Sequence, residues 1–509
     1  MWRSAFATHG LALTAVALAC RSALGAEVDP LLASQARERG VVESLIVLPD
    51  QAAPSLTPLD ANADYKIHRR ALVDALRSRA TAQQADLRQW LDTRGIEYHA
   101  YWISNLVWAR LSSADLSALA QRRDVAKVAT NPQIPMHLPQ QTAALQIPDA
   151  VEAIGWGVAK INAPLVWAAG FNGQGVVIAG EDTGYQWNHP ALINHYRGWD
   201  GAQADHNYNW HDAIHTNGGA NVCGVDSPAP CDDDGHGTHT AGTFVGGDGG
   251  SNQIGVAPGS KWIGCRNMDA GAGTPARYIE CMQWLLAPTD LADANPNPDL
   301  APDIVSNSWS CPPSEGCTVG NEIQGAVNAV VAGGIFFAAA AGNTNATHTN
   351  ACGQINEAPA IYDASFVVGA TGTADGLANF SLRGPVADSS LIRPDISAPG
   401  VSVCSSIPTN SYSCAYSGTS MATPHVAGAA ALVLSINPAL KGHPDQIAQI
   451  LRATAARTGV TDPIAQTCGG TLASQWPNNM LGYGRVDAYA AAVMADTLFK
   501  DGFDGAAAN

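Results

Sequence analysis

Apolar residues in the first quarter of the chain follow a strand-like spacing and then a helical one. Residues 43–48 form a short apolar run, and residues 65–92 carry apolar side chains at helical spacing. Residues 97–111 alternate broadly as strands do, residues 113–122 fit a short helix, and residues 125–128 fit a last strand. This β-α-β-β-α-β order predicts a small α+β domain of ferredoxin-like type. The apolar positions expected on the long helix are Ile67, Ala71, Leu76, Ala80, Leu87 and Leu91.

A different pattern begins near residue 151 and continues to about residue 493. Short apolar runs alternate there with helical stretches and glycine-rich loops, which predicts an α/β domain built on a parallel sheet. The expected strands are residues 175–184, 304–306, 335–340, 366–370 and 401–405.

The first 26 residues have the composition of a secretory signal peptide. An arginine precedes an apolar run over residues 11–19, and small residues lead to a cleavage point after Gly25 or Ala26. The run is too short for a lasting transmembrane helix, and no other segment qualifies by this measure. A lipoprotein signal ending at Cys20 is the alternative. We therefore expect a secreted protein, extracellular or periplasmic, with no membrane partner.

Charge and composition divide the chain near residue 150. Residues 27–150 carry 13 Lys and Arg against 14 Asp and Glu and contain no cysteine, whereas the remainder carries 12 against 30. Such an acidic region repels phosphates, which argues against a nucleic-acid partner. Between the two parts, residues 131–150 are rich in Pro, Gln and Ala, which is typical of an exposed, cleavable linker.

Four polar side chains stand where predicted elements begin or end. Ser420 lies where a small-residue turn enters an apolar helix, near backbone N–H groups and the positive end of the helix dipole. Serine alone is a poor nucleophile and is common as a helix N-cap, so catalysis would need a base and an acid. His236, flanked by glycines, is the candidate base, and Asp182, at the end of an apolar strand, is the acid that would hold its tautomer. Asn343 ends another strand, and its amide could donate to a developing oxyanion.

Together these motifs resemble those of the subtilisin-type serine peptidases, the subtilases. The resemblance implies that Ser420 is the nucleophile and His236 the general base and acid, while Asp182 orients His236 and Asn343 forms the oxyanion hole with the Ser420 backbone N–H. It implies a subtilisin-like three-layer sandwich with a mostly parallel sheet. It also implies a monomeric serine endopeptidase that cuts proteins or peptides through an acyl-enzyme and requires no cofactor.

The resemblance covers nearly the whole chain. Residues 156–164, 395–400 and 482–488 also look like subtilase features, and the N-terminal α+β domain is similar to the subtilase propeptide, which inhibits the active site. An unrelated binding module is the alternative for that domain. We expect an activating cut between Met136 and Val151, and the sequence does not determine which bond is cut. The expected regions are a signal peptide over residues 1–26, a propeptide over 27–150, a peptidase domain over 151–495 and a tail of unknown role over 496–509.

Other function classes fit the motifs less well. A lipase or esterase carries Gly-x-Ser-x-Gly with a different order of triad residues, whereas Ser420 lies in Gly-x-Ser-x-Ala. A non-catalytic binding protein would need neither a triad nor a removable N-terminal domain. An inactive relative is disfavoured because none of the four motifs is broken.

Substrate binding is expected along two strand edges, because peptidases of this family hold the substrate as an added strand. By resemblance these edges contain Ser308, Trp309 and Ser310 on one side and Ala340 and Gly342 on the other. Trp309 is either a pocket wall or an ordinary core aromatic.

Glu357 falls near the base of the family's primary specificity pocket. A carboxylate there would favour Lys or Arg before the scissile bond, and a solvated loop glutamate is the alternative.

Cysteine usage agrees with export, since ten of the 11 cysteines follow residue 151. Proximity in sequence suggests Cys223–Cys231, Cys311–Cys317 and Cys404–Cys414, and Cys265–Cys281 and Cys352–Cys468 are left over. Many other pairings remain open. A zinc site would want cysteines spaced two to four apart, a pattern that is absent.

Structural calcium is possible but poorly supported by the sequence. Ala191 stands where the family often has aspartate, and Asp248 is the main side-chain ligand in the second family loop. Other carboxylates, at Asp205, Asp212 and residues 232–234, could bind calcium, although a solvated acidic loop is favoured. A transition-metal site on His206, His211 and His215 is a further alternative.

Overall fold

The computed structural model describes residues 25–51, 64–138, 153–216 and 221–504. Nearly all of the predicted signal peptide and the second half of the predicted linker therefore lie outside the described residues. The chain forms two compact units. Among the described residues, the first contains 25–51, 80–100 and 105–130, and the second contains the remainder.

The first unit is built on one five-stranded sheet. Its strand order is β1 (Glu27–Val28), β5 (Lys127–Thr130), β2 (Val41–Val47), β4 (Leu106–Ser112) and β3 (Tyr98–Tyr101). β2 pairs antiparallel with both β4 and β5, and β4 lies between β2 and β3, the two strands that flank α2 (Tyr65–Arg94) in the chain. This split β-α-β arrangement is the ferredoxin-like topology expected from the sequence. The remaining helix of that pattern is α3 (Ser113–Leu119).

The sequence patterns did not predict β1 or the helix α1 (Pro30–Arg39) that follows it. Only Leu32 and Ala36 of α1 are buried, so the apolar periodicity is weak. The signal that was present is local, because Asp29 accepts a hydrogen bond from the Leu31 N–H at 2.9 Å and Pro30 occupies the first turn.

The long helix α2 has its predicted extent but a different buried face. Ile67 and Ala71 are exposed, Ile67 by 61%, whereas the apolar stripe starts at Leu72. In this first part of α2, which belongs to the second unit, Arg69 is buried instead, and its Nε donates to the Gly333 carbonyl at 2.6 Å. The predicted stripe was therefore wrong at its start and right from Leu76 onward.

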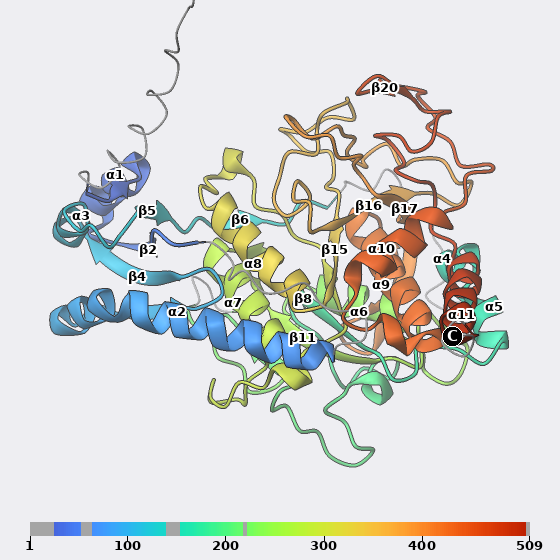
Figure 1. Ribbon diagram of the computed structural model, residues 1–509, viewed down its shortest axis with the longest axis horizontal. Coiled ribbons are helices and arrows are strands. Elements are labelled where there is room, and N and C mark those ends of the chain that lie inside the picture. The colour runs from blue at the N-terminus through green and yellow to red at the C-terminus, as the bar shows by residue number, and fades with distance from the viewer. Residues whose placement is uncertain (1–24, 52–63, 139–152, 217–220, 505–509) are drawn as a thin grey trace, which may run out of the picture. The chain divides into compact units, whose positions relative to one another are not determined.

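The second unit is organised around a seven-stranded sheet (Figure 1), in which every pair of neighbouring strands is parallel. The order across the sheet is β17 (Ile396–Pro399), β16 (Phe366–Thr371), β15 (Phe336–Ala340), β14 (Ile304–Asn307), β8 (Val177–Asp182), β11 (Lys261–Arg266) and β9 (Trp210–Asp212). The predicted strand over residues 401–405 is not part of it. β18 (Val403–Ile407) pairs antiparallel with β19 (Ser411–Tyr416) as a separate hairpin, since the preceding strand β17 already closes that edge of the sheet.

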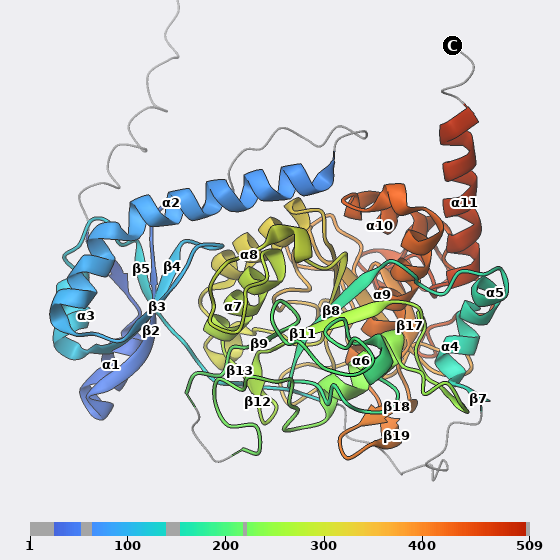
Figure 2. The same cartoon turned by 90° about the horizontal axis from the view of Figure 1, so that it is seen from below.

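Helices cover both faces of this sheet, which gives the expected three-layer α/β architecture. α7 (Pro275–Leu286) packs against α8 (Gly320–Ala332) on one side, and α6 (His236–Val245) packs against α9 (Thr419–Ile436) on the other (Figure 2). Further helices are α4 (Trp156–Lys160), α5 (Ala163–Ala168), α10 (Pro444–Ala453) and α11 (Ala488–Asp504). The short strands are β6 (Ile134–Pro135), β7 (Ala153–Ile154), β10 (Asn252–Gln253), β12 (Met268–Asp269), β13 (Ala272–Gly273), β20 (Thr467–Cys468) and β21 (Thr471–Leu472).

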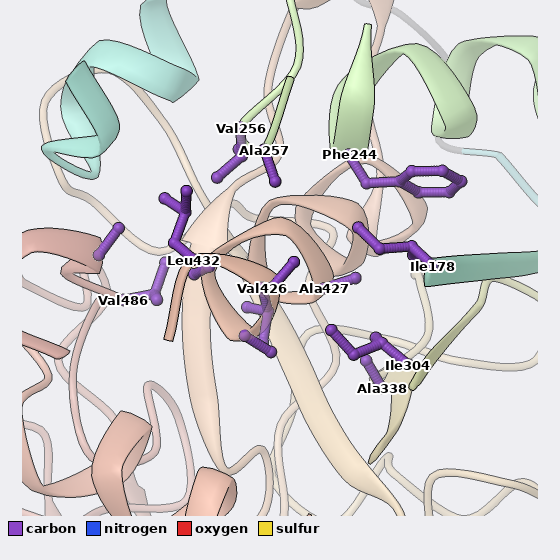
Figure 3. Packing of buried hydrophobic residues seen from close by; sticks show 14 of the residues in the cluster. Ile178, Phe244, Val256, Ala257, Ile304, Ala338, Val426, Ala427, Leu432 and Val486 are labelled. Carbon is purple, nitrogen blue, oxygen red and sulfur yellow. The ribbon is translucent and has the colours of Figure 1, made fainter. Parts of the chain in front are cut away.

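The core of the second unit surrounds α9. Figure 3 shows Val426 and Leu432 of this helix among aliphatic side chains from the sheet and from neighbouring loops. By length and composition α9 could cross a membrane, which the sequence analysis overlooked, yet 94% of it is buried inside the protein. Small side chains along the helix let it lie close to the strands below it, as a central helix requires.

All five suggested disulfides are present in the structure. They are Cys223–Cys231, Cys265–Cys281, Cys311–Cys317, Cys352–Cys468 and Cys404–Cys414.

Two segments differ from their expected character. The tail predicted from residue 496 is not separate, because α11 continues through Asp504. The predicted linker is not exposed throughout, because Ile134 is 2% exposed and β6 pairs antiparallel with β13.

Candidate active site

Asp182 is the last residue of β8 and is buried at the carboxyl end of the sheet. Its Oδ1 accepts a hydrogen bond from the Thr183 N–H at 2.8 Å and lies 2.6 Å from Nδ1 of His236. Its Oδ2 accepts from the Thr240 hydroxyl at 3.2 Å. Because an ionised carboxylate can only accept hydrogen bonds, this arrangement places the proton of His236 on Nδ1.

His236 is the first residue of α6 and is fully buried. The turn before it is held by Asp232, whose carboxylate accepts from the backbone N–H groups of Gly235 at 2.8 Å and Thr238 at 2.9 Å. Burial opposes the charged imidazole, but the charge and hydrogen bond of Asp182 outweigh it, so the pKa of His236 is raised above its ordinary value. Among the described residues, nothing hydrogen-bonds to Nε2 of His236. This nitrogen is left as a basic acceptor.

Ser420 is the second residue of α9, the helix that packs against α6. Its side chain is buried, and its Oγ lies 3.5 Å from the Ser308 carbonyl. No hydrogen bond joins Ser420 Oγ to His236 Nε2 in the described part of the chain. Contacts of this type are often loose in an unreacted enzyme and tighten when the reacting carbonyl arrives.

Asn343 follows β15, and its side-chain amide is held in one orientation. Its Oδ1 accepts from the Thr419 N–H at 2.9 Å and from the Thr419 hydroxyl at 3.1 Å. The same hydroxyl accepts from the Gly342 N–H at 3.2 Å. The sequence analysis did not single out Thr419, although it directly precedes Ser420. With its oxygen fixed in this way, Asn343 presents Nδ2 as the donor.

One cleft brings the predicted substrate-binding residues together beside Ser420 and Asn343. Its lining includes Ser308, Trp309, Ser310, Ala340, Gly342 and Glu357. Trp309 is both a wall of the cleft and a buried aromatic side chain, the two alternatives considered for it. It lines the cleft, and it is 4% exposed with its ring stacked on Tyr278 at a centroid distance of 4.0 Å.

Glu357 is buried in this cleft, so the interpretation as a solvated loop glutamate was wrong. Its Oε1 lies 3.1 Å from Nε2 of His348. Burial raises the pKa of the Glu357 carboxyl above its ordinary value, although Ser310 and His348 oppose the shift.

The chain itself enters the same cleft. Residues 134–137 line it, β6 pairs with β13, and the Met136 N–H donates to the Gly271 carbonyl at 2.8 Å. The carbonyl of His137 accepts a hydrogen bond from Asn343 Nδ2 at 3.1 Å. The segment therefore lies as an added strand with one of its carbonyls on the Asn343 amide.

Comparison with known proteins agrees with this geometry. The model of the subtilase family matches residues 173–484. Over 289 residues the chain is 31% identical to subtilisin of Bacillus pumilus, and the aligned region covers 56% of this chain and 86% of that protein. The chain belongs to the subtilase family. Membership classes it with the serine endopeptidases.

A longer relative matches more of this subtilase than the family model does. The chain is 36% identical over 457 residues to bacillopeptidase F of Bacillus subtilis, covering 86% of this chain but only 30% of that protein. It is also 32% identical over 312 residues to alkaline elastase YaB of a Bacillus strain, covering 61% of this chain and 67% of that protein. The chain thus spans less than a third of the length of bacillopeptidase F.

In this subtilase, the carboxylate of the second loop considered for calcium is already engaged by the protein's own groups. Ala191 is buried, and the Asp248 carboxylate accepts from the Gly250 N–H at 2.8 Å and the Asn252 amide at 2.6 Å. Within the described residues, no group of three or more His, Cys, Asp or Glu side chains is arranged to hold a metal ion.

Part of the acidic region considered for calcium is engaged within the protein, which corrects the favoured interpretation for Asp212, Asp232 and Asp233, whereas Asp205 and Asp234 are exposed. Asp232 supports the turn before α6, and Asp212 forms a buried ion pair with Arg266 at 2.9 Å. Asp233 lies 3.4 Å from the same guanidinium. These carboxylates neutralise a buried arginine and cap a turn.

The three histidines of this region do not converge on one point. His211 and His215 both contact Oε1 of Glu280, at 2.8 and 2.7 Å, and His206 instead contacts the Tyr196 hydroxyl at 2.9 Å. Burial opposes protonation of the first two, but Glu280 and further carboxylates raise the pKa of His211 to about 10 and of His215 to about 9. Protonated imidazoles repel metal ions, so these residues form an ion-pair cluster.

Proposed function

We propose that this subtilase is a secreted serine endopeptidase made as a self-inhibited zymogen. Asp182, His236 and Ser420 form its triad, and Asn343 and the Ser420 N–H form its oxyanion hole. The observation that carries the proposal is the carbonyl of His137, which accepts a hydrogen bond from Asn343 Nδ2 at 3.1 Å in the cleft that Ser420 lines. A peptide carbonyl on that amide is where a scissile carbonyl should lie.

The mechanism follows from these positions. Nε2 of His236 takes the Ser420 proton as Oγ attacks the peptide carbonyl, and the resulting oxyanion is stabilised by Asn343 Nδ2 and the backbone. The hydrogen bond from Nδ1 to Asp182 stabilises the imidazolium that forms. His236 then protonates the leaving amine, and water releases the acyl group from Ser420 by the reverse route.

The other expected regions belong to the same proposal. Residues 1–26 direct export, residues 27–150 act as an intramolecular inhibitor and folding aid, and residues 151–495 form the peptidase domain of a monomer, with α11 extending it into residues 496–504. Five disulfides in the second unit favour an oxidising, extracellular or periplasmic location. Substrates are proteins or peptides bound as an added strand, and the chemistry uses no cofactor.

The test compares the exported wild-type protein with Ser420→Ala and with a matched control, Ser435→Ala. Ser435 is also in α9, but its hydroxyl donates to the Leu432 carbonyl within the helix. We would measure casein hydrolysis, labelling by a fluorophosphonate, and the intact mass of each protein. Wild type and Ser435→Ala should hydrolyse casein, take up the label and lose their N-terminal region.

Ser420→Ala should show none of these properties and should lose only the signal peptide. Removing the nucleophile lowers kcat by about 10⁶-fold, so residual casein hydrolysis above about a thousandth of wild type contradicts the triad. Equal N-terminal cleavage of both variants would instead show that another protease matures the chain, and the self-processing part of the proposal would be wrong.

A further inference from the structure

His137, whose carbonyl accepts the hydrogen bond from Asn343, places its side chain against a carboxylate from a different part of the chain. Nε2 of His137 lies 2.6 Å from Oε1 of Glu315. Glu315 ends a single 3₁₀ turn, Pro313–Glu315, inside the loop that the Cys311–Cys317 disulfide closes. Since the carbonyl of His137 accepts from Asn343, this side chain occupies the position directly before the bond that Ser420 would attack.

The disulfide loop holds Glu315 in place. The Glu315 N–H donates to the Pro312 carbonyl at 3.1 Å, and the Cys317 N–H donates to the same carbonyl at 3.3 Å. The loop directly follows Ser310, which lines the cleft. A disulfide that spans six positions leaves this loop few alternative conformations, so the carboxylate is preorganised beside His137, which lines the cleft.

One oxygen of this carboxylate is still unused. Oε2 of Glu315 is buried and has no hydrogen-bond partner among the described residues. A buried carboxylate oxygen without a donor is costly, and the imidazole of His137 supplies only one N–H to the pair. A guanidinium could donate to both oxygens at once, because its fork matches the spacing of a carboxylate.

Glu357, the acid among the residues that line the cleft, is already engaged. It is 9% exposed and paired with His348 at 3.1 Å. Of the two carboxylates, Glu315 is the one that contacts the occupant of the cleft directly.

We propose that Glu315 is the specificity-determining residue of this peptidase, that it selects a basic side chain before the scissile bond with Arg preferred, and that the chain cuts itself between His137 and Leu138. This inference rests on the proposed function. In the self-cleavage, a bond forms between Ser420 Oγ and the carbonyl carbon of His137, and the bond from that carbon to the Leu138 nitrogen breaks. His236 delivers its proton to the leaving Leu138 amine, and water then hydrolyses the ester to leave His137 with a free carboxylate.

The first experiment measures kcat/KM on peptides that differ only in the residue before the scissile bond, with Arg or Leu at that position. Glu315→Gln should lower the Arg-to-Leu ratio about 10- to 100-fold and leave the Leu peptide within about twofold of wild type, since only a charge-assisted contact is lost. The matched control is Glu357→Gln in the same cleft, which should leave the ratio within about threefold of wild type. An unchanged ratio in Glu315→Gln, or a larger fall in Glu357→Gln, would overturn the assignment.

The second experiment follows self-processing of the full chain by mass at early times. The first N-terminal fragment should end at His137, and a first fragment with another end overturns the assigned bond. The variant His137→Glu should process itself more slowly than wild type, because it places two carboxylates together. The double variant His137→Glu with Glu315→Lys should process itself at least tenfold faster than His137→Glu alone. Failure of this rescue, with the Leu peptide still hydrolysed by the processed enzyme, refutes the role of Glu315.

A failure of the proposed function would look different from a failure of this inference. In that case wild type would hydrolyse neither peptide, and Ser420→Ala would be indistinguishable from it. Active wild type with no preference for Arg over Leu would overturn the specificity claim alone.

Discussion

Removing the Thr419 hydroxyl should weaken catalysis through Asn343 without changing the shape of the site. Thr419 is fully buried, and Val has nearly the same shape, so Thr419→Val deletes one polar atom. That atom donates to Asn343 Oδ1 at 3.1 Å and accepts from the Gly342 N–H at 3.2 Å. The Thr419 backbone N–H, at 2.9 Å, would be the remaining donor to Asn343.

The size of the effect follows from this count of donors. Removing an oxyanion-hole amide costs about 10²- to 10³-fold in kcat, or about 2.7–4 kcal/mol. The Thr419 hydroxyl is one of two donors that orient the Asn343 amide, so its loss should cost about half of that free energy. We expect kcat to fall about 10- to 30-fold with KM nearly unchanged, because the contact matters once the oxyanion forms. The unpaired Gly342 N–H should also lower the free energy of unfolding by about 1–3 kcal/mol.

The assay is steady-state hydrolysis of a peptide amide by each processed enzyme, matured in trans where necessary. Thr423→Val is the control, because Thr423 is buried in the same helix and its hydroxyl donates only to the Thr419 carbonyl, at 2.9 Å. Asn343→Ala completes a double-mutant cycle. If Thr419→Val lowers kcat by the same factor with and without Asn343, or if Thr423→Val has an equal effect, the hydroxyl does not act through Asn343 and the reasoning is wrong.

Three further predictions concern stability and pH. Replacing both Cys352 and Cys468 by Ala should cost about 4–5 kcal/mol of unfolding free energy in urea melts, because the disulfide closes a loop of 116 positions. Glu280 stabilises two imidazoles whose pKa values are raised to about 10 and about 9. This contribution is complete below about pH 6.5 and is lost as the pH rises through those values, so wild-type stability should decline across that range and Glu280→Gln should flatten the decline. The acid limb of kcat/KM should lie above about pH 6.5, because the raised pKa of His236 keeps the base protonated to higher pH, and Asp182→Asn should move the limb downward while lowering kcat about 10⁴-fold.

Much of the site's placement could be predicted from sequence because each polar residue stands at the end of a regular element. Asp182 closes a buried parallel strand, and Asn343 follows another strand two positions away in the sheet. The carboxyl ends of parallel strands meet at one edge, so residues far apart in sequence are delivered to the same place. His236 and Ser420 add to this edge from the N-termini of two helices that pack together. Their roles in the reaction remain the subject of the proposal.

The parts that sequence analysis missed depend on long-range pairing instead. β6 has two residues, one of them proline, so it carries no periodicity, and it is a strand only because the β13 edge is available to it. The polar linker composition around it correctly suggested a cleavable segment but wrongly suggested exposure throughout. Likewise, nothing in the residues around Arg69 predicts that a guanidinium, and not Ile67, faces the protein.

Glu315 shows the same limit at the level of specificity. By sequence, Glu357 was the natural candidate, because it lies close to a segment that resembles the family's pocket. In the folded chain Glu357 pairs with His348, while the carboxylate that contacts the bound segment comes from a short disulfide-closed loop. The sequence of such a loop has no periodic pattern of apolar residues from which it could be predicted, and its position is set by one disulfide and by the strand it follows. It follows that relatives with an intact triad can differ in the side chain they select without any change in the strands that carry the catalytic groups, so specificity in this chain should be altered by substitutions within residues 311–317 while the turnover of uncharged substrates is retained.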